Sequence, residues 1–413
     1  MAVSVKQAKA ASGHASSNVF IPLHFAPGDA FQFDWSTEVV TLNGVATKLK
    51  VAQVRLSYSR ALFIKAYHGE SLEMLFDAHG SALQYFGGVP RRGIYDNMKT
   101  AVTKIERGKA RVFNRHFLQM ASHYLFEPVA CTPASGWEKG QIENQVGNVR
   151  EWVFVPRLSL ANLTELNAHL LQRCNELNDT RAHPQQADKT LREMLNEERA
   201  ALNPLPHPFD GSVEKITRVS STSLVQYDKQ KYSVPCEYVG HTVALRASAE
   251  HLDIYDSGQF VYRHERMFGV PRCHYCPWHY VKALERKPGA LRNGAPFVDW
   301  VLPEPLQRVQ HKLLQHDGGD RAFVQVLLAV QSVGLELVTV ACELALDAHV
   351  VNVEHILNVV NRLHSTPHAE AIQTPAQLQL QHEPIADIAR YDHLLECSKS
   401  SAKKLTQELS HAA

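Results

Sequence analysis

Three acidic residues that lie far apart in the sequence could form one metal-binding site. Asp34 lies midway in the first predicted strand, Asp96 at the end of the fourth, and Glu143 on the helix after the last strand. Because the carboxyl ends of parallel strands open on one crevice, these acids can converge there with Asp34 of the adjacent central strand. Carboxylate oxygens suit Mg²⁺, with Mn²⁺ as a substitute. Two such ions about 3.5–4 Å apart support an in-line phosphoryl displacement.

Basic residues accompany the acids. Lys139 lies four residues before Glu143 and Arg150 seven after it, so the three share one face of a helix. Lys99 follows Asp96 closely. These cations predict contacts with DNA phosphates, and Lys99, Lys139 and Arg150 are the candidates. For Lys139 the alternative is a plain helical pair with Glu143, worth ~0.2–0.5 kcal/mol.

Positive charge is concentrated in one stretch of the sequence. The whole chain carries a net charge of only +1, whereas the stretch 88–157 holds eleven Lys and Arg against six Asp and Glu, an excess of five. A basic patch of this kind provides the salt-dependent part of DNA affinity. The alternative is a solvated loop at 104–111.

Hydrophobic spacing predicts the elements that must position the acids. In the first strand Phe31, Phe33 and Trp35 alternate with polar residues, so Asp34 points away from the aromatic side. Three antiparallel strands are followed by alternating helices and strands, which predicts an α/β fold whose late strands are parallel. The strands are expected at 31–36, 49–56, 61–67, 89–95 and 127–131, with Asp96 at the end of the fourth, and the helices at 70–86, 113–124 and 138–152.

Composition and cysteine usage limit the class of protein. The chain is 45% hydrophobic and 21% charged, as in globular proteins, so disorder throughout is excluded. Seven cysteines and no apolar leader predict a reduced, cytoplasmic compartment and no membrane. The apolar stretch 323–346 is interpreted as a core helix, because polar residues interrupt it. No phosphate-binding loop of the ATPase type occurs.

A small cysteine–histidine cluster and the isolated histidines are weaker signals of function. Cys273, Cys276 and His279 have zinc-like spacing, but no second cysteine pair accompanies them, which favours a packing role. The chain has 23 histidines, so isolated ones such as His68 and His79 receive no role.

Several motifs resemble those of IstA-type transposases of the bacterial insertion-sequence-21 family. The resemblance covers about residues 29–363. Its motifs are FQFDWS at 31–36, YDNMKTAV at 95–102, ACTPASGWEKGQIENQVG at 130–147, KYSVP at 231–235, RKPGAL at 286–291 and GAPF at 294–297.

The resemblance implies a ribonuclease-H-like integrase core with an Asp-Asp-Glu site at Asp34, Asp96 and Glu143. Glu138 and Glu151 are rival third carboxylates, and Glu143 is preferred because its surroundings match the family motif. Asn97 is a further candidate DNA contact, as is Trp137, which could stack on an unpaired base. The expected segments are a flexible lead-in at 1–28, the core at 29–165, a helical segment and linker at 166–209, a small β-barrel of about five strands at 210–268, a Pro/Gly/Arg-rich linker at 269–300, an α-helical domain at 301–365 and a tail at 366–413.

The resemblance also implies an activity and partners. Such enzymes cut the 3′ ends of an insertion sequence and join them to target DNA. They work as homo-oligomers on both element ends, with an IstB-like AAA+ ATPase as helper, in the bacterial cytoplasm and at the nucleoid when DNA-bound. Relatives usually carry a helix-turn-helix region before the core, whereas 33 residues precede Asp34 here. The alternatives are therefore a catalytically idle DNA-binding remnant and a metal-dependent ribonuclease on the same fold.

Overall fold

A computed structural model describes residues 24–95, 102–105, 111–130 and 143–365 of the chain, with only the backbone given for 102–105, 111–112 and 143–148. The chain forms two compact units, Met1–Val301 and Leu302–Ala413.

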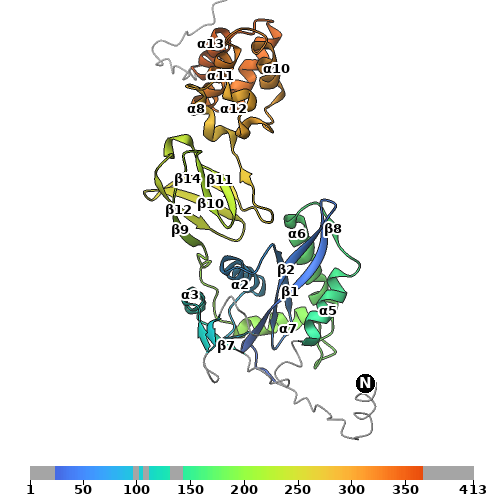
Figure 1. The fold of residues 1–413 in the computed structure, drawn as a ribbon. Helices are drawn as coiled ribbons and strands as arrows, with labels where there is room; N and C mark the ends of the chain where they lie inside the picture. Colours follow the sequence, from blue (N-terminus) through green and yellow to red (C-terminus); the bar gives the residue numbers. More distant parts are fainter. Residues whose placement is uncertain (1–23, 96–101, 106–110, 131–142, 366–413) are drawn as a thin grey trace, which may run out of the picture. The chain divides into compact units, whose positions relative to one another are not determined.

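A mixed sheet forms the centre of the first unit (Figure 1). Its main strands follow the order β3-β2-β1-β4-β7. The first three are antiparallel, and β4 and β7 run parallel to β1, which is the order of a ribonuclease-H-like core. The predicted α/β fold is therefore confirmed. The strands are β1 (Ala30–Leu42), β2 (Val45–Leu56), β3 (Leu62–Tyr67), β4 (Arg92–Tyr95), β7 (Glu127–Ala130) and β8 (Ser159–Leu160), which pairs with the end of β1.

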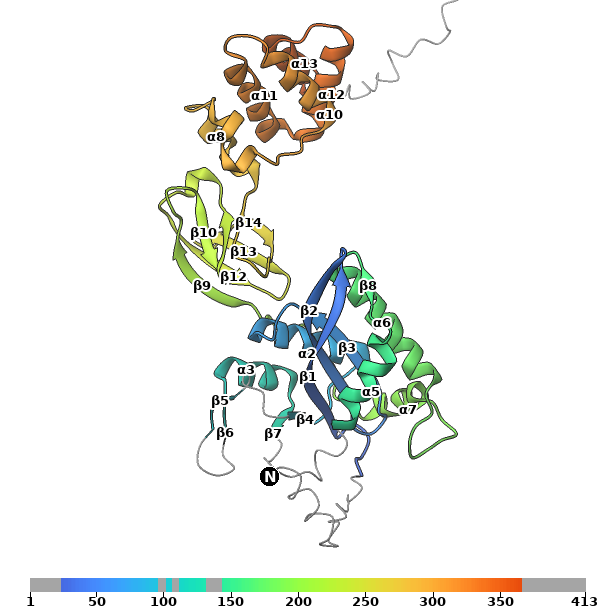
Figure 2. The same cartoon turned by 45° about the vertical axis from the view of Figure 1, so that its right-hand side comes forward.

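Helices cover both faces of this sheet. Phe31 and Phe33 of β1 pack in one cluster with α2 (Leu72–Phe86) and α3 (Arg115–Tyr124). Val40 of β1 packs in another with α5 (Glu143–Phe154) and α6 (Leu163–Thr180). Figures 1 and 2 show α2 on one side of the sheet and α5 and α6 on the other. The alternation of β1 thus places Asp34 on the α5 side, as predicted.

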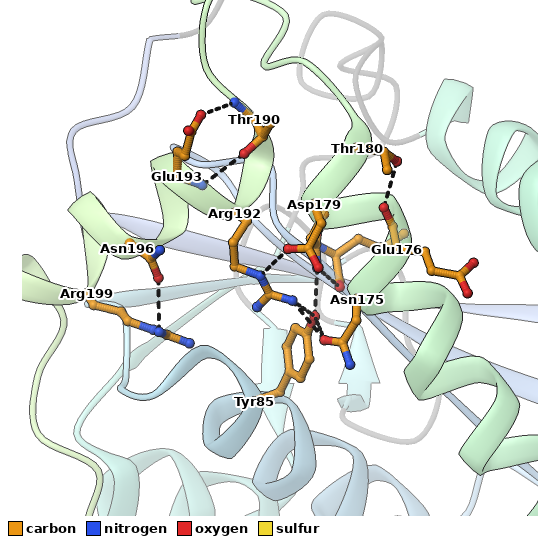
Figure 3. A network of polar contacts seen from close by, with 12 residues as sticks. Tyr85, Asn175, Glu176, Asp179, Thr180, Thr190, Arg192, Glu193, Asn196 and Arg199 are labelled. Atoms are coloured by element: carbon orange, nitrogen blue, oxygen red, sulfur yellow. Dashed lines mark hydrogen bonds and ion pairs between the residues drawn. The ribbon is translucent and has the colours of Figure 1, made fainter.

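Polar contacts hold the next helices against the core. Arg192 of α7 (Leu191–Glu198) donates to Asp179 Oδ1 at 2.7 Å and to Asn175 Oδ1 at 2.8 Å on α6. The Tyr85 hydroxyl of α2 donates to the same Asn175 oxygen at 2.9 Å (Figure 3). A capping box between Thr190 and Glu193 starts α7. The helical segment after the core is therefore packed on it, and a short 3₁₀ turn, η1 (Arg199–Ala201), follows.

Residues beyond 212 form two small sheets around their own hydrophobic cluster. About five strands were expected, and six lie between residues 213 and 265. Most side chains of β9 (Val213–Arg218) are polar, and the strand is largely exposed. The strands are β9 (Val213–Arg218), β12 (Thr242–Ala247), β13 (His251–Asp256) and β14 (Gln259–Glu265) in one sheet, and β10 (Leu224–Tyr227), β11 (Gln230–Ser233) and β15 (Cys273–His274) in the other.

Short elements complete the first unit. A two-stranded ribbon, β5 (Val102–Ile105) and β6 (Arg111–Phe113), precedes α3. The remaining turns and helices are η2 (Cys236–Tyr238), η3 (Pro277–Tyr280), α8 (Val281–Leu284), α9 (Ala290–Asn293) and η4 (Ala295–Phe297).

The second unit is helical. The stretch 323–346, interpreted as a core helix, is helical and largely buried, but it is divided between two helices. Helix α11 (Gly319–Val333) ends before Gly334, whose φ is 92°, and α12 (Leu335–Asp347) begins after it. That left-handed backbone favours glycine and breaks the helix. The unit also contains α10 (Glu304–Leu313) and α13 (Val353–His364). Within the described residues, no helix has the length and apolar character needed to cross a membrane.

Candidate active site

Asp34 lies at the centre of the sheet, on the face that α5 covers. It pairs in register with Gln53 of β2, and its Oδ1 accepts the backbone N–H of Trp35 at 2.8 Å. The side chain is half-buried. On the same face, Gln53 Nε2 donates to the Ser36 hydroxyl at 2.9 Å. Asp34 is therefore a carboxylate on a rigid strand, in a polar strip of the sheet.

The strand before Asp96 is the direct neighbour of the strand that carries Asp34. Tyr95 ends β4 and lies in register with Phe33 of β1. Neighbouring strands are about 4.7–4.9 Å apart. The residues that immediately precede the two acids are thus opposite one another. Asp96 itself lies outside the described residues, as do Asn97 and Lys99.

His79 of α2 contacts both of these preceding residues. Its ring stacks on Phe33, with centroids 4.6 Å apart and planes 8° apart. Its Nδ1 lies 2.7 Å from the Leu75 carbonyl and its Nε2 2.8 Å from the Tyr95 hydroxyl. Nδ1 therefore donates to the carbonyl, and Nε2 accepts the Tyr95 proton. Burial lowers the pKa of His79 to about 4, so the ring is neutral at pH 7.

This role of His79 was missed from the sequence. Its position four residues after Leu75 on an amphipathic helix is the available signal, and that position alone indicates burial rather than a hydrogen bond to β4.

Helix α5 begins at Glu143 and is fixed to the Asp34 face of the sheet. Val149 and Val153 are buried in the cluster that α5 shares with the sheet. Arg150 donates through Nε and Nη2 to the Glu38 carboxylate at 2.9 and 3.0 Å. Glu38 lies four residues after Asp34 on β1 and therefore on the same face. Helix α5 therefore packs, through residues 149–154, on the face of the sheet that carries Asp34.

Most of the other predicted DNA contacts lie outside the part of the chain that the structure describes. Lys139 and Trp137 lie outside the described residues, and so does the rival Glu138. The Glu143 side chain is likewise outside them, so the distances between the three carboxylates stay predictions. Arg150 is paired with Glu38 but keeps 52% of its side chain exposed.

Cys273, Cys276 and His279 are the candidate zinc ligands. In the structure His279 instead contacts Ser233. Its Nδ1 lies 2.8 Å from the Ser233 hydroxyl, which also accepts the Cys276 N–H at 2.8 Å. No cluster of three metal-ligating residues occurs in the described parts of the chain. The contacts of His279 and Cys276 hold the segment after the barrel to β11.

Comparison with known sequences defines the class of protein. A family model described as the Mu transposase C-terminal domain matches residues 205–273, which include the strands β9 to β14. A transposase for insertion sequences IS1326/IS1353 from Pseudomonas aeruginosa is 45% identical over 380 residues, which cover 91% of this chain and 74% of that protein. A transposase from Aminobacter aminovorans is 44% identical, with 91% of this chain and 75% of that protein covered. The chain is therefore a transposase.

The family follows from a further relative. The transposase for insertion sequence element IS21 from Pseudomonas aeruginosa is 32% identical over 63% of this chain and 69% of its own length. The chain belongs to the insertion-sequence-21 family of transposases, as its motifs predicted.

Solved structures with some likeness are retroviral integrases. The HTLV-2 integrase catalytic core domain in complex with magnesium is 14% identical, covers 41% of this chain and 97% of that chain, and has a TM-score of 0.31. A simian T-cell lymphotropic virus intasome is 12% identical, covers 60% of this chain and 82% of that chain, and has a TM-score of 0.34. Both TM-scores are low. The ribonuclease-H-like fold of this chain therefore follows from the order of its strands and from its family.

Proposed function

We propose that this transposase cuts the 3′ ends of an insertion sequence and joins them to target DNA at a site formed by Asp34, Asp96 and Glu143. The observation that carries the proposal is the pairing of Phe33 with Tyr95, because it sets the strand that leads to Asp96 beside the strand that holds Asp34. The attachment of α5 to the same face supports the inclusion of Glu143.

The proposed ligands fit a hard divalent cation. Asp34 offers a half-buried carboxylate on a rigid strand. Together with Asp96 and Glu143 it would hold two Mg²⁺ or Mn²⁺ ions, since these ions prefer oxygen ligands. Such ions stabilise charge on phosphoryl oxygens and activate the attacking oxygen.

The chemistry has two displacement steps. In cleavage, water attacks the phosphorus at the element end, the bond to the 3′ oxygen breaks, and the element keeps a free 3′-OH. In joining, that 3′-OH attacks a phosphorus of target DNA, a new phosphodiester bond forms, and the 3′ oxygen of the target leaves. Lys99, Lys139 and Arg150 would hold the phosphates. Asn97 would contact the strand, and Trp137 would stack on an unpaired base.

Membership of the family supports an oligomeric form that acts on DNA. We infer that the chain acts as a homo-oligomer on both insertion-sequence ends and on target DNA, in the bacterial cytoplasm and at the nucleoid. An IstB-like AAA+ ATPase would prepare the target.

A joining assay separates this proposal from its alternatives. Element ends supplied with a free 3′-OH, target DNA and Mn²⁺ should give joined products. A DNA-binding remnant would bind these ends in a salt-sensitive way without products. A ribonuclease would degrade RNA–DNA hybrids and join nothing. Either of these two results would overturn the proposal.

A further inference from the structure

The outer face of one barrel sheet carries a row of apolar side chains. The sheet has the strand order β14-β13-β12-β9 (Figure 2). The residues on either side of Ala244 in β12 are buried in the barrel core, so Ala244 points to the outer face. Ala244 lies in register with Ile216 of β9 and with Tyr255 of β13, and Tyr255 lies in register with Phe260 of β14. The row therefore crosses all four strands.

The large side chains at the two ends of this row are open to solvent. Ile216 is 69% exposed and Phe260 is 56% exposed. The Tyr255 ring contacts the Phe260 ring edge-on, with centroids 5.7 Å apart, so both rings lie on the outer face. Apolar side chains that are grouped on one face, rather than scattered singly, are typical of an interaction surface.

A row of charged side chains lies beside the apolar row. Arg246 of β12 lies in register with Glu214 of β9 and with Asp253 of β13, and Asp253 lies in register with Arg263 of β14. Arg263 donates to the two Asp253 oxygens at 2.6 and 2.8 Å. Arg246 also forms an ion pair with Asp210, which precedes β9. Across the four strands the charges thus run negative, positive, negative, positive.

This alternation of charge favours a protein partner. A nucleic-acid backbone is uniformly negative and is bound by positive surfaces. The charged row instead contains two acidic and two basic side chains. Read in the opposite direction it runs positive, negative, positive, negative, so the row is complementary to its own reverse.

A second copy of the chain can supply that reversed row. Sheets pack face to face with nearly aligned strands, and a twofold axis sets the same surface against itself. If the axis runs along the strands, between β12 and β13, then β9 of one copy lies opposite β14 of the other, and β12 lies opposite β13.

Both rows are complementary in this arrangement. Glu214 faces Arg263 of the second copy, and Arg246 faces its Asp253. In the apolar row Ile216 faces Phe260 of the second copy, and the small side chain of Ala244 faces the large one of Tyr255. The two surfaces therefore agree in charge and in size.

We propose that this face of the barrel sheet joins two copies of the chain, with the apolar row as its contact and the charged row fixing its direction. The inference rests on the homo-oligomer of the proposed function and names one of its interfaces. It depends on neither the catalytic acids nor DNA. Association measured without DNA or metal therefore tests the interface separately from the chemistry.

The first test compares two exposed β-branched residues. Ile216→Glu places a carboxylate in the apolar row. The matched control is Val270→Glu, because Val270 is 71% exposed and its carbonyl accepts from Gln230 of β11 in the other sheet. The dissociation constant of the full chain is measured by sedimentation with a chelator present. Ile216→Glu should raise it at least about tenfold, because a carboxylate buried without a partner is costly, and Val270→Glu should leave it unchanged.

The second test reverses one charge in each of two separate chains. Glu214→Arg and Arg263→Glu should each associate more weakly alone, because like charges then face each other across the contact. Mixed in equal amounts, the two variants should prefer heteromers, because the new arginine at position 214 faces the new glutamate at position 263. The Asp253 contact that Arg263→Glu loses within its own copy is lost in both states and does not affect this preference.

Several results would overturn the proposal. A wild type that stays monomeric at its highest soluble concentration would do so, as would an Ile216→Glu variant that associates normally. Random mixing of the two charge variants would exclude this direction of packing. Normal association with DNA affinity lower in Ile216→Glu than in Val270→Glu would make the face a nucleic-acid surface. A lower Tm of Ile216→Glu at concentrations where the wild type is monomeric would indicate a structural role within one copy.

Discussion

Arg150 of α5 holds the Glu38 carboxylate of β1 through both Nε and Nη2, and the same guanidinium reaches the Thr37 carbonyl at 3.2 Å. The Glu38 side chain is only 6% exposed, whereas that of Arg150 is 52% exposed. The pair ties the helix that starts at Glu143 to the strand that carries Asp34. It can therefore fix the position of one proposed metal ligand relative to another.

Unequal burial of the two partners predicts unequal effects of mutation. Arg150→Gln should lower the free energy of unfolding by about 1–3 kcal/mol, because it leaves a buried carboxylate without its cation. Glu38→Gln should lower it less, because it leaves a cation that water can reach. Urea unfolding of both single variants and the double variant measures the coupling. Additive effects would show that the pair contributes nothing as a pair.

The Tyr95 hydroxyl is predicted to stabilise the end of β4. Tyr95→Phe should lower the free energy of unfolding by about 1–3 kcal/mol, since His79 Nε2 would lose its donor in a buried site. It should also raise the Mg²⁺ concentration needed for strand joining, because Tyr95 precedes Asp96. The double variant Tyr95→Phe/His79→Leu removes both partners of this hydrogen bond. It is the control that shows how much of the loss comes from leaving His79 Nε2 without a donor. A Mg²⁺ requirement unchanged in Tyr95→Phe would contradict a positioning role.

Acid should destabilise the protein through His79. Its pKa is about 4 when folded and about 6.5 when unfolded, so below pH 6.5 the unfolded chain takes up a proton that the folded chain does not. Stability should therefore fall as the pH drops from 6.5 to 4, by about 3 kcal/mol from this residue. In His79→Gln the stability at neutral pH should be lower and the slope in this range smaller. An unchanged slope would show that His79 does not titrate as inferred. His279, whose pKa burial also lowers to about 4, should keep part of the slope.

Local patterns in the sequence predicted much of the frame around the site. The alternation of Phe31, Phe33 and Trp35 was enough to place Asp34 on the opposite face, because side-chain direction along a strand is a local property. The antiparallel start and parallel end of the sheet followed from the order of elements. The family motifs identified the class of protein.

Contacts between distant elements could not be predicted in this way. Glu38 and Arg150 are 112 residues apart, so the sequence did not indicate that Arg150 also pairs with Glu38. Arg55, Arg60 and Arg181 line one small cavity, and their spacing in the sequence does not indicate this. The helix break at Gly334 was not predicted, because one glycine within a helical pattern does not by itself determine where a helix ends.

The central claim is that Asp34, Asp96 and Glu143 form one catalytic site. Its most direct test is strand joining with pre-processed element ends and Mg²⁺, for Asp34→Asn, Asp96→Asn and Glu143→Gln beside the rival carboxylates Glu138→Gln and Glu151→Gln. The account predicts that the first three variants lose joining while they fold and bind DNA nearly as the wild type does, and that the last two keep joining. Undiminished joining by any of the first three would contradict it.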